Sequence, residues 1–232
     1  DGSRGRKVLK EILKDRQVKA LQSDGYNVYM YIDKELVDTE HLCCLAHARA
    51  KFVYAYEQGD DPDAKYLIDC FGELYRLGDT YKLSGLSAQE ITSCRHSLRT
   101  KEIIGRIRSK LDVLLSPTHP PRGELMDKAV NYLQVFWKQL FAYLNDGRYD
   151  IDNSIAERFI RPLAGERKNS LFFVGSRMAN VSAAYHTLLS TCRMNGLSAL
   201  EYLKKFFHEI LKGRKDYENL LPMTIELTTN KY

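Results

Sequence analysis

Apolar residues at helical spacing between residues 62 and 147 constrain the fold most. They recur every three or four residues, the period of helices that bury one face. The stripes are Leu67, Cys70, Phe71, Leu74 and Leu77; then Ile103, Ile104, Ile107, Leu111, Leu114 and Leu115; then Met126, Ala129, Val130, Leu133, Phe136, Trp137, Leu140 and Leu144. Ser87 and Glu90 form a capping-box pattern that opens a further helix. Prolines in residues 116–123 separate the second stripe from the third. The pattern predicts a helical subdomain whose last helix covers 124–144.

Shorter elements alternate before this subdomain. The pattern predicts a helix over 5–15, a strand over 17–22, a buried strand over 41–46 and then a helix that ends at Gly59. Residues 26–36 are aromatic without a clear period. Helices alternating with strands favour an α/β fold, here one that is mainly helical.

After residue 147 the pattern predicts a short helix over 150–162, which Asp152 or Asn153 caps and Pro162 ends. An extended segment over 168–176 and helices over about 179–194 and 199–212 follow, the last opened by Ser198. The expected division is 1–61 as a first core part, 62–147 as a helical insertion, 148–212 as a second core part and 213–232 as a polar tail.

The composition of the 232 residues favours a soluble cytoplasmic protein. Apolar residues make up 44% of the chain and charged residues 28%. No run of about 18 apolar residues is present, so we expect no transmembrane helix and no membrane partner. The N-terminal residues lack the apolar segment of a signal peptide. Five scattered cysteines are typical of reduced thiols in the cytoplasm.

Charge is unevenly distributed along a chain whose net charge is +5. Residues 56–90 are acidic, whereas residues 156–178 are basic. The basic side chains of the second segment are Arg158, Arg161, Arg167, Lys168 and Arg177. This distribution favours one surface that binds a polyanion such as DNA.

Asp24 is the first candidate for a chemical role. It follows the predicted strand over 17–22 and precedes Gly25. Functional loops of α/β sheets lie at the carboxyl ends of strands, so Asp24 could bind a metal ion. An ordinary Asp-Gly turn explains the same residues, and both interpretations stay open.

Glu157 is the second candidate carboxylate. Arg161 lies four residues further along the same predicted helix, so an ion pair within the helix is one explanation. The surrounding basic residues favour another, in which Glu157 helps bind a metal ion beside DNA phosphates. Mg²⁺ prefers oxygen ligands, and one or two carboxylates plus substrate phosphate are its usual set.

The segment 41–47 suggests a zinc site through three residues: His41, either Cys43 or Cys44, and His47. A closed zinc site needs four ligands, and no second cluster of cysteine and histidine follows in the sequence. Adjacent residues of a strand also point to opposite faces. Packing and positioning roles for Cys44 and His47 are therefore favoured over zinc binding.

Four blocks together resemble the DDE-type transposases of the insertion-sequence-66 family. Residues 21–26 are similar to the family's L-Q-x-D-G-Y, and residues 44–52 to C-W-A-H-A-R-R-K-F with differences at Leu45 and Ala50. Residues 152–176 are similar to D-N-x-x-A-E-R-x-x-R-P followed by R-K-N and F-x-G-S. Residues 191–196 with Tyr202 and Leu203 are similar to the closing helices. The resemblance covers nearly the whole chain.

This resemblance implies a partial ribonuclease-H-like fold with a large helical insertion. It implies that Asp24 and Glu157 are the second and third carboxylates of a triad that binds two Mg²⁺ or Mn²⁺ ions. Cys44 and His47 would support the site from behind these ligands. Arg158, Arg161, Arg167 and Lys168 would contact DNA phosphates. The implied function is metal-dependent cleavage and transfer of DNA strands by a bacterial mobile element, in a synaptic complex that is a homo-oligomer.

One difference from the family bears on activity. The family's first catalytic aspartate lies in an Asp-Glu-Thr motif, which is absent from these 232 residues. We therefore expect the chain to correspond to the C-terminal part of the catalytic region and to be inactive alone. The alternatives are a non-catalytic DNA-binding or assembly remnant, and a ribonuclease-H-like nuclease that hydrolyses DNA without joining it.

Overall fold

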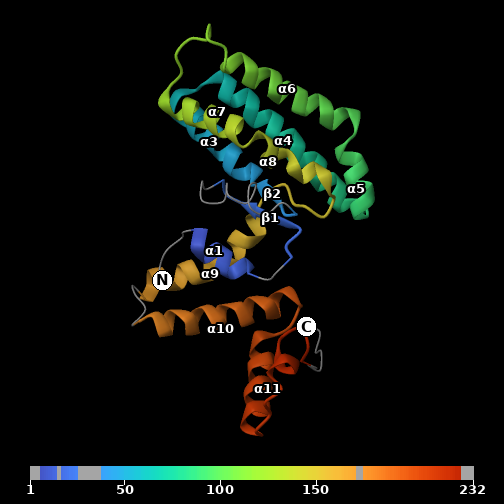
Figure 1. Cartoon of the computed structure of the whole chain (residues 1–232), viewed down its shortest axis with the longest axis vertical. Coiled ribbons are helices and arrows are strands. Elements are labelled where there is room, and N and C mark those ends of the chain that lie inside the picture. Colours follow the sequence, from blue (N-terminus) through green and yellow to red (C-terminus); the bar gives the residue numbers. More distant parts are fainter. Residues whose placement is uncertain (1–5, 15–16, 26–37, 171–174, 226–232) are drawn as a thin grey trace. The chain divides into compact units, whose positions relative to one another are not determined.

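Residues 6–14, 17–25, 38–170 and 175–225 are described by a computed structural model of the chain. It divides into two units, Asp1–Ser154 and Ile155–Tyr232, and each is described by itself (Figure 1). The predicted mainly helical α/β character is confirmed within the described residues. The finer prediction of a ribonuclease-H-like fold stays a prediction.

Two short parallel strands form the sheet in the described part of the first unit. Helix α1 (Arg6–Leu13) precedes strand β1 (Ala20–Ser23), which pairs with β2 (Glu40–Cys43) so that Ser23 lies opposite Cys43. The first strand thus begins later than predicted. The ambiguous segment 26–36 lies outside the described residues. Because α3 (Leu45–Gly59) follows β2 after one residue, the sheet and the helices share one core.

Helices α3, α4 (Pro62–Leu83), α6 (Leu98–Leu114) and α7 (Glu124–Val135) pack side by side (Figure 1). The predicted stripes face inward: Leu67, Phe71, Ile103, Ile107, Leu111, Met126 and Leu133 are buried. The rings of Phe52 and Phe71 lie 5.9 Å apart at the centre. Ser87 and Glu90 form the predicted capping box of α5 (Ala88–Arg95). The helical stripes therefore build the core of this unit.

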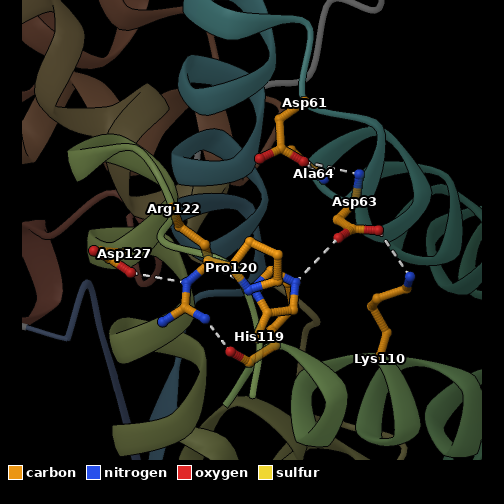
Figure 2. A network of polar contacts seen from close by, with 9 residues as sticks. Asp61, Asp63, Ala64, Lys110, His119, Pro120, Arg122 and Asp127 are labelled. Carbon is orange, nitrogen blue, oxygen red and sulfur yellow. Dashed lines mark hydrogen bonds and ion pairs between the residues drawn. The ribbon is translucent and has the colours of Figure 1, made fainter. Parts of the chain in front are cut away.

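Polar contacts hold the proline-containing loop 116–123 to the helices around it (Figure 2). Asp63 accepts a hydrogen bond from Lys110 at 2.8 Å, and His119 Nε2 lies 3.7 Å from the same carboxylate. Arg122 donates to Asp127 at 2.8 Å. Arg122 also donates to Leu114 O at the end of α6, so loop 116–123 is tied to α4, α6 and α7.

The prediction of one helix over 124–144 is wrong. Helix α7 ends at Val135, and Phe136 has a non-helical backbone (φ −101°, ψ 15°) before α8 (Trp137–Phe141) and the 3₁₀ helix η2 (Ala142–Asn145). All five residues from Gln139 to Tyr143 are buried. A straight helix with one solvent-exposed side cannot bury five consecutive residues, so the chain changes direction at Phe136.

The prediction that this helix ends at Gly59 is confirmed, although the residue in the left-handed conformation is the one that follows the glycine. Gly59 is the last helical residue, and Asp60 adopts the left-handed conformation with φ 47°. Aspartate tolerates this region better than most residues, because its short side chain can form local hydrogen bonds. Asp60 N donates to Tyr56 O at 2.7 Å and closes the helix.

In the second unit, α9 (Ser154–Ser170) continues through Pro162, which corrects the predicted stop. The predicted extended segment is helical up to Ser170, and residues 171–174 lie outside the described part. Proline removes one hydrogen bond from a helix, to the carbonyl four residues earlier. Pro162 and Arg158 are exposed, so water can solvate that carbonyl. The Glu166 carboxylate also contacts α10: it accepts a hydrogen bond from Ser182 Oγ at 2.6 Å and lies 2.7 Å from His186 Nε2.

Helices α10 (Ser176–Met194) and α11 (Ala199–Leu211) match the two predicted closing helices. A second core joins Cys192, Tyr202, Leu220 and Ile225. The hydroxyl of Tyr202 donates to Leu220 O, at 3.1 Å, in the 3₁₀ helix η3 (Tyr217–Leu220). The segment predicted as a polar tail therefore contributes two buried apolar residues to this core.

Candidate functional site

Asp24 lies directly after β1, where its side chain is exposed. Its carbonyl oxygen accepts a hydrogen bond of 2.9 Å from the hydroxyl of Tyr132 on α7. The preceding residue, Ser23, accepts two further hydrogen bonds: its Oγ accepts from Gly25 N at 3.3 Å, and its carbonyl oxygen accepts from Cys44 N at 2.9 Å. We call residues 23–25 the Asp24 loop. Its backbone is held at several points, and Asp24 itself is an exposed residue.

Ser23, the first residue of the Asp24 loop, belongs to a buried polar cluster with His41 and Cys43. Ser23 Oγ is 2.9 Å from His41 Nε2, and each of these atoms is 4.0 Å from Cys43 Sγ. These residues are buried, and hydrogen bonding offsets the cost of desolvating their polar atoms. Within the described ranges, no three residues of the metal-binding types gather into a group that could hold an ion.

Cys44 and His47 occupy the junction between β2 and α3. Cys44 is buried, and its Sγ accepts a 3.5 Å hydrogen bond from Asn153 N. Leu45 N donates to Ile151 O at 3.1 Å. Burial raises the pKa of the Cys44 thiol, against the opposing effect of backbone hydrogen bonds, and a protonated thiol is a poor nucleophile. Cys44 therefore joins the junction to the segment that precedes α9, while His47 sits half-buried in the first turn of α3.

Residues 146–154, which we call the connecting segment, are bonded to several elements. Gln22 donates to Asp150 O at 3.1 Å, and Lys82 pairs with the Asp150 carboxylate at 2.6 Å. Ser154 N donates to Asp152 Oδ1 at 3.0 Å. Burial favours a high pKa for Asp152, but hydrogen bonds from Ser154, with the nearby Tyr75 and Lys82, outweigh it and lower this pKa. Asp152 is therefore a carboxylate at neutral pH.

Arg95 fixes the start of this segment, and sequence reasoning missed it. It is only 7% exposed. Its guanidinium donates to Tyr143 O and Asp146 O, both at 2.6 Å, and to Tyr149 O at 2.8 Å. Gly147 N donates to Thr92 Oγ1 at 2.8 Å. An arginine in the last turn of a helix usually interacts with that helix's own carbonyls, so the sequence gives no signal for this role.

A groove of about 570 Å³ lies between α3 and α4 in the same unit. Its polar lining includes Arg49, Tyr54, Glu57, Tyr75 and Asp152. Arg49 and Asp152 come from two of the sequence blocks described above, and the fold places them on one surface. The groove therefore offers a polar ligand a positive charge, negative charges and two aromatic rings.

Glu157 lies in the first turn of α9 and is exposed. A carboxylate there interacts favourably with the positive end of the helix dipole. Arg158, Arg161 and Lys168 are exposed on the same helix, which also carries Arg167. Asp24 belongs to the first unit, whereas Glu157 and these basic residues belong to the second.

The donor chemistry of Asp24 and Glu157 fits a hard divalent ion. Both side chains are exposed and provide carboxylate oxygens, which Mg²⁺ and Mn²⁺ prefer over nitrogen or sulfur. Neither belongs to a preformed three-residue cluster within the described parts of the chain. Each is therefore suited to be one ligand of a site that further groups complete.

Comparison with known proteins identifies one family whose model matches this chain. The family model described as "Transposase IS66 family" matches residues 1–181, a range that includes both carboxylates. Two uncharacterized proteins of Sinorhizobium fredii, y4jD and y4qI, are 27% and 31% identical to this chain, and each alignment covers 87% of it. The alignments span 40% and 38% of those relatives' own lengths. No solved structure matches the chain.

Proposed function

The chain belongs to the IS66 transposase family, and from this membership we propose that it supplies part of the catalytic region of a DNA transposase. The match over residues 1–181 carries the proposal, because it contains both candidate carboxylates within their motifs. The exposed carboxylate of Asp24 at the end of a parallel strand supports it, as does the fixed backbone of the Asp24 loop. The proposed fold of the complete region is ribonuclease-H-like.

In this proposal Asp24 and Glu157 each donate carboxylate oxygens to divalent ions, two Mg²⁺ or Mn²⁺ in the complete site. Such ions stabilise the attacking and leaving oxygens when a phosphodiester is displaced. In this proposal, residues of the chain position the two carboxylates. The Asp24 loop holds one carboxylate in place, and the first turn of α9 presents the other. Cys44 keeps the connecting segment beside the β2–α3 junction, next to His47.

The proposed partner is DNA, both transposon ends and target. Arg158, Arg161, Arg167 and Lys168 on α9 would bind backbone phosphates, which position a duplex without reading its sequence. The matched segment is well under half of its relatives' length, so the activity of the whole protein is part of the proposal. We also propose assembly as a homo-oligomer on DNA, in the cytoplasm. No described helix combines the length and apolar character needed to span a bilayer.

The test replaces each carboxylate by its amide in the protein expressed from its complete reading frame. Asp24→Asn and Glu157→Gln should each abolish Mn²⁺-dependent strand transfer, because an amide is a much weaker metal ligand, and DNA binding should persist. Asp79→Asn and Glu218→Gln are matched controls at exposed positions and should keep activity. Strand transfer retained by either site variant overturns the assignment of that carboxylate.

The exposed basic residues of α9 favour a second candidate, a non-catalytic DNA-binding or assembly module. The same assay separates the candidates. A wild-type protein that binds DNA tightly without cutting or joining it is such a module. Hydrolysis without joining identifies a ribonuclease-H-like nuclease instead.

A further inference from the structure

Tyr132 on α7 and the Asp24 loop form a contact between residues 108 positions apart in the chain. The tyrosine hydroxyl lies 2.9 Å from the carbonyl oxygen of Asp24. A carbonyl oxygen can only accept, so the hydroxyl donates its proton. A tyrosine hydroxyl has an ordinary pKa of about 10, so it keeps its proton and remains a donor throughout the neutral range.

The ring of Tyr132 is held on two sides, which fixes the direction of its hydroxyl. The Phe136 ring lies 4.8 Å away, centroid to centroid, at a tilt of 44°. Lys51 Nζ lies 4.9 Å from the Tyr132 centroid, within the range of a cation–π interaction. A ring held by these two contacts has little freedom to move its hydroxyl away from the Asp24 carbonyl.

Gly25 makes room for the hydroxyl. It adopts φ +78°, in the region that favours glycine. A Cβ at this position would lie 2.4 Å from the Tyr132 hydroxyl oxygen, far inside van der Waals contact. The glycine after Asp24 thus allows both the turn and the close approach of Tyr132. This explains the Asp-Gly pair more specifically than a surface turn does.

The peptide groups on the two sides of Asp24 are held by different elements. The preceding carbonyl, of Ser23, accepts from Cys44 N at the β2–α3 junction. The following carbonyl, of Asp24 itself, accepts from Tyr132 on α7. With both flanking peptide groups bonded, rotation about the two backbone bonds of Asp24 is restricted. The direction in which its Cβ points is therefore defined by the fold.

We propose that Tyr132 is a positioning residue for Asp24: its hydroxyl orients the Asp24 backbone so that the carboxylate is presented for metal binding. The proposal rests on the proposed function of Asp24. It assigns the helical stretch 62–147 a direct role at the site, because α7 supplies the hydroxyl. Tyr132 itself contacts neither metal nor DNA in this role.

The test is Tyr132→Phe, which removes only the hydroxyl and keeps the half-buried ring. The matched control is Tyr81→Phe, since Tyr81 also donates to a backbone carbonyl, that of Cys94, at 3.3 Å in the same unit. In the 232-residue chain, Tyr132→Phe should speed amide hydrogen exchange in the Asp24 loop about fivefold, the equivalent of one hydrogen bond. Tyr81→Phe should leave exchange there unchanged.

The second measurement uses the protein from its complete reading frame. Tyr132→Phe should raise the Mn²⁺ concentration for half-maximal strand transfer severalfold, and excess Mn²⁺ should restore much of the rate. A purely structural hydroxyl would not shift the metal requirement. Faster exchange with an unchanged Mn²⁺ requirement, or no change in either, overturns the proposal. Activity retained by Asp24→Asn instead refutes the function of Asp24, and the role of Tyr132 falls with it.

Discussion

Replacing Arg95 by methionine tests whether the connecting segment depends on one buried guanidinium. Arg95→Met keeps the apolar length of the side chain and removes hydrogen bonds to three carbonyl oxygens. Hydrogen bonds from a charged donor contribute about 1.5–3 kcal/mol each. Two offsets reduce the sum. The carbonyls of Asp146 and Tyr149 are only partly buried and can regain water, and methionine avoids the desolvation that lowers the pKa of Arg95.

The expected net loss is about 3 kcal/mol of unfolding free energy, a large share of the roughly 5–15 kcal/mol of a typical domain. Arg95→Lys should lose nearly as much, because an ammonium keeps the charge without the planar fork that reaches three carbonyls. Arg76→Met on α4 is the control. Arg76 is exposed, so its replacement should change stability by less than about 0.5 kcal/mol.

Urea unfolding followed by the fluorescence of Trp137 measures this loss. Trp137 is the single tryptophan of the chain and lies in the first unit, so its signal reports on the unit that contains Arg95. With a slope of about 1–3 kcal/mol per molar urea, the Arg95→Met midpoint should fall by about 1–3 M. A midpoint shift no larger than that of Arg76→Met would refute the reasoning, and the connecting segment would then be held by its other contacts.

Two further predictions concern the same unit and the same fluorescence assay. Gly147→Ala should destabilise the unit by about 2 kcal/mol or more, because the Cβ of the new alanine would lie 2.1 Å from Ala88 O. In the control Gly78→Ala, the new Cβ meets no atom within 4 Å, so this variant should be neutral or stabilising. Equal urea midpoints for the two variants would contradict this. The hydrogen bond from Arg106 lowers the pKa of Glu73 below its ordinary 4.5, so the unfolded chain takes up the proton first as the pH falls. The stability that this pair contributes is therefore complete above pH 4.5 and is lost as the pH falls through the pKa of the folded protein. Glu73→Gln should make the free energy of unfolding fall less steeply with decreasing pH below 4.5. An unchanged pH dependence in this variant would contradict the assignment.

Local patterns in the sequence predicted most of the helices and the strand-to-helix order around Asp24. Apolar stripes such as Leu67 to Leu77 repeat with the period of one helix, and Ser87 and Glu90 mark a helix start through bonds three residues apart. These features depend on neighbouring residues, so a sequence displays them directly. The same is true of the motif blocks around Asp24 and Glu157, which indicated the family before any geometry was known.

Other features depended on contacts between distant residues. The break at Phe136 follows from burial of five consecutive residues, and α9 continues past Pro162, where the carbonyl left without a partner belongs to an exposed residue. Both contradict local expectations.

The connections of the candidate site were equally hidden from the sequence. Arg95 bonds carbonyls about fifty residues away, and Tyr132 bonds Asp24 across 108 residues. Backbone carbonyls are the same at every position, so no residue type marks them as partners. The sequence identified the candidate carboxylate, whereas the tertiary structure determined which side chains bond to its backbone, because those bonds form only after the helices have packed.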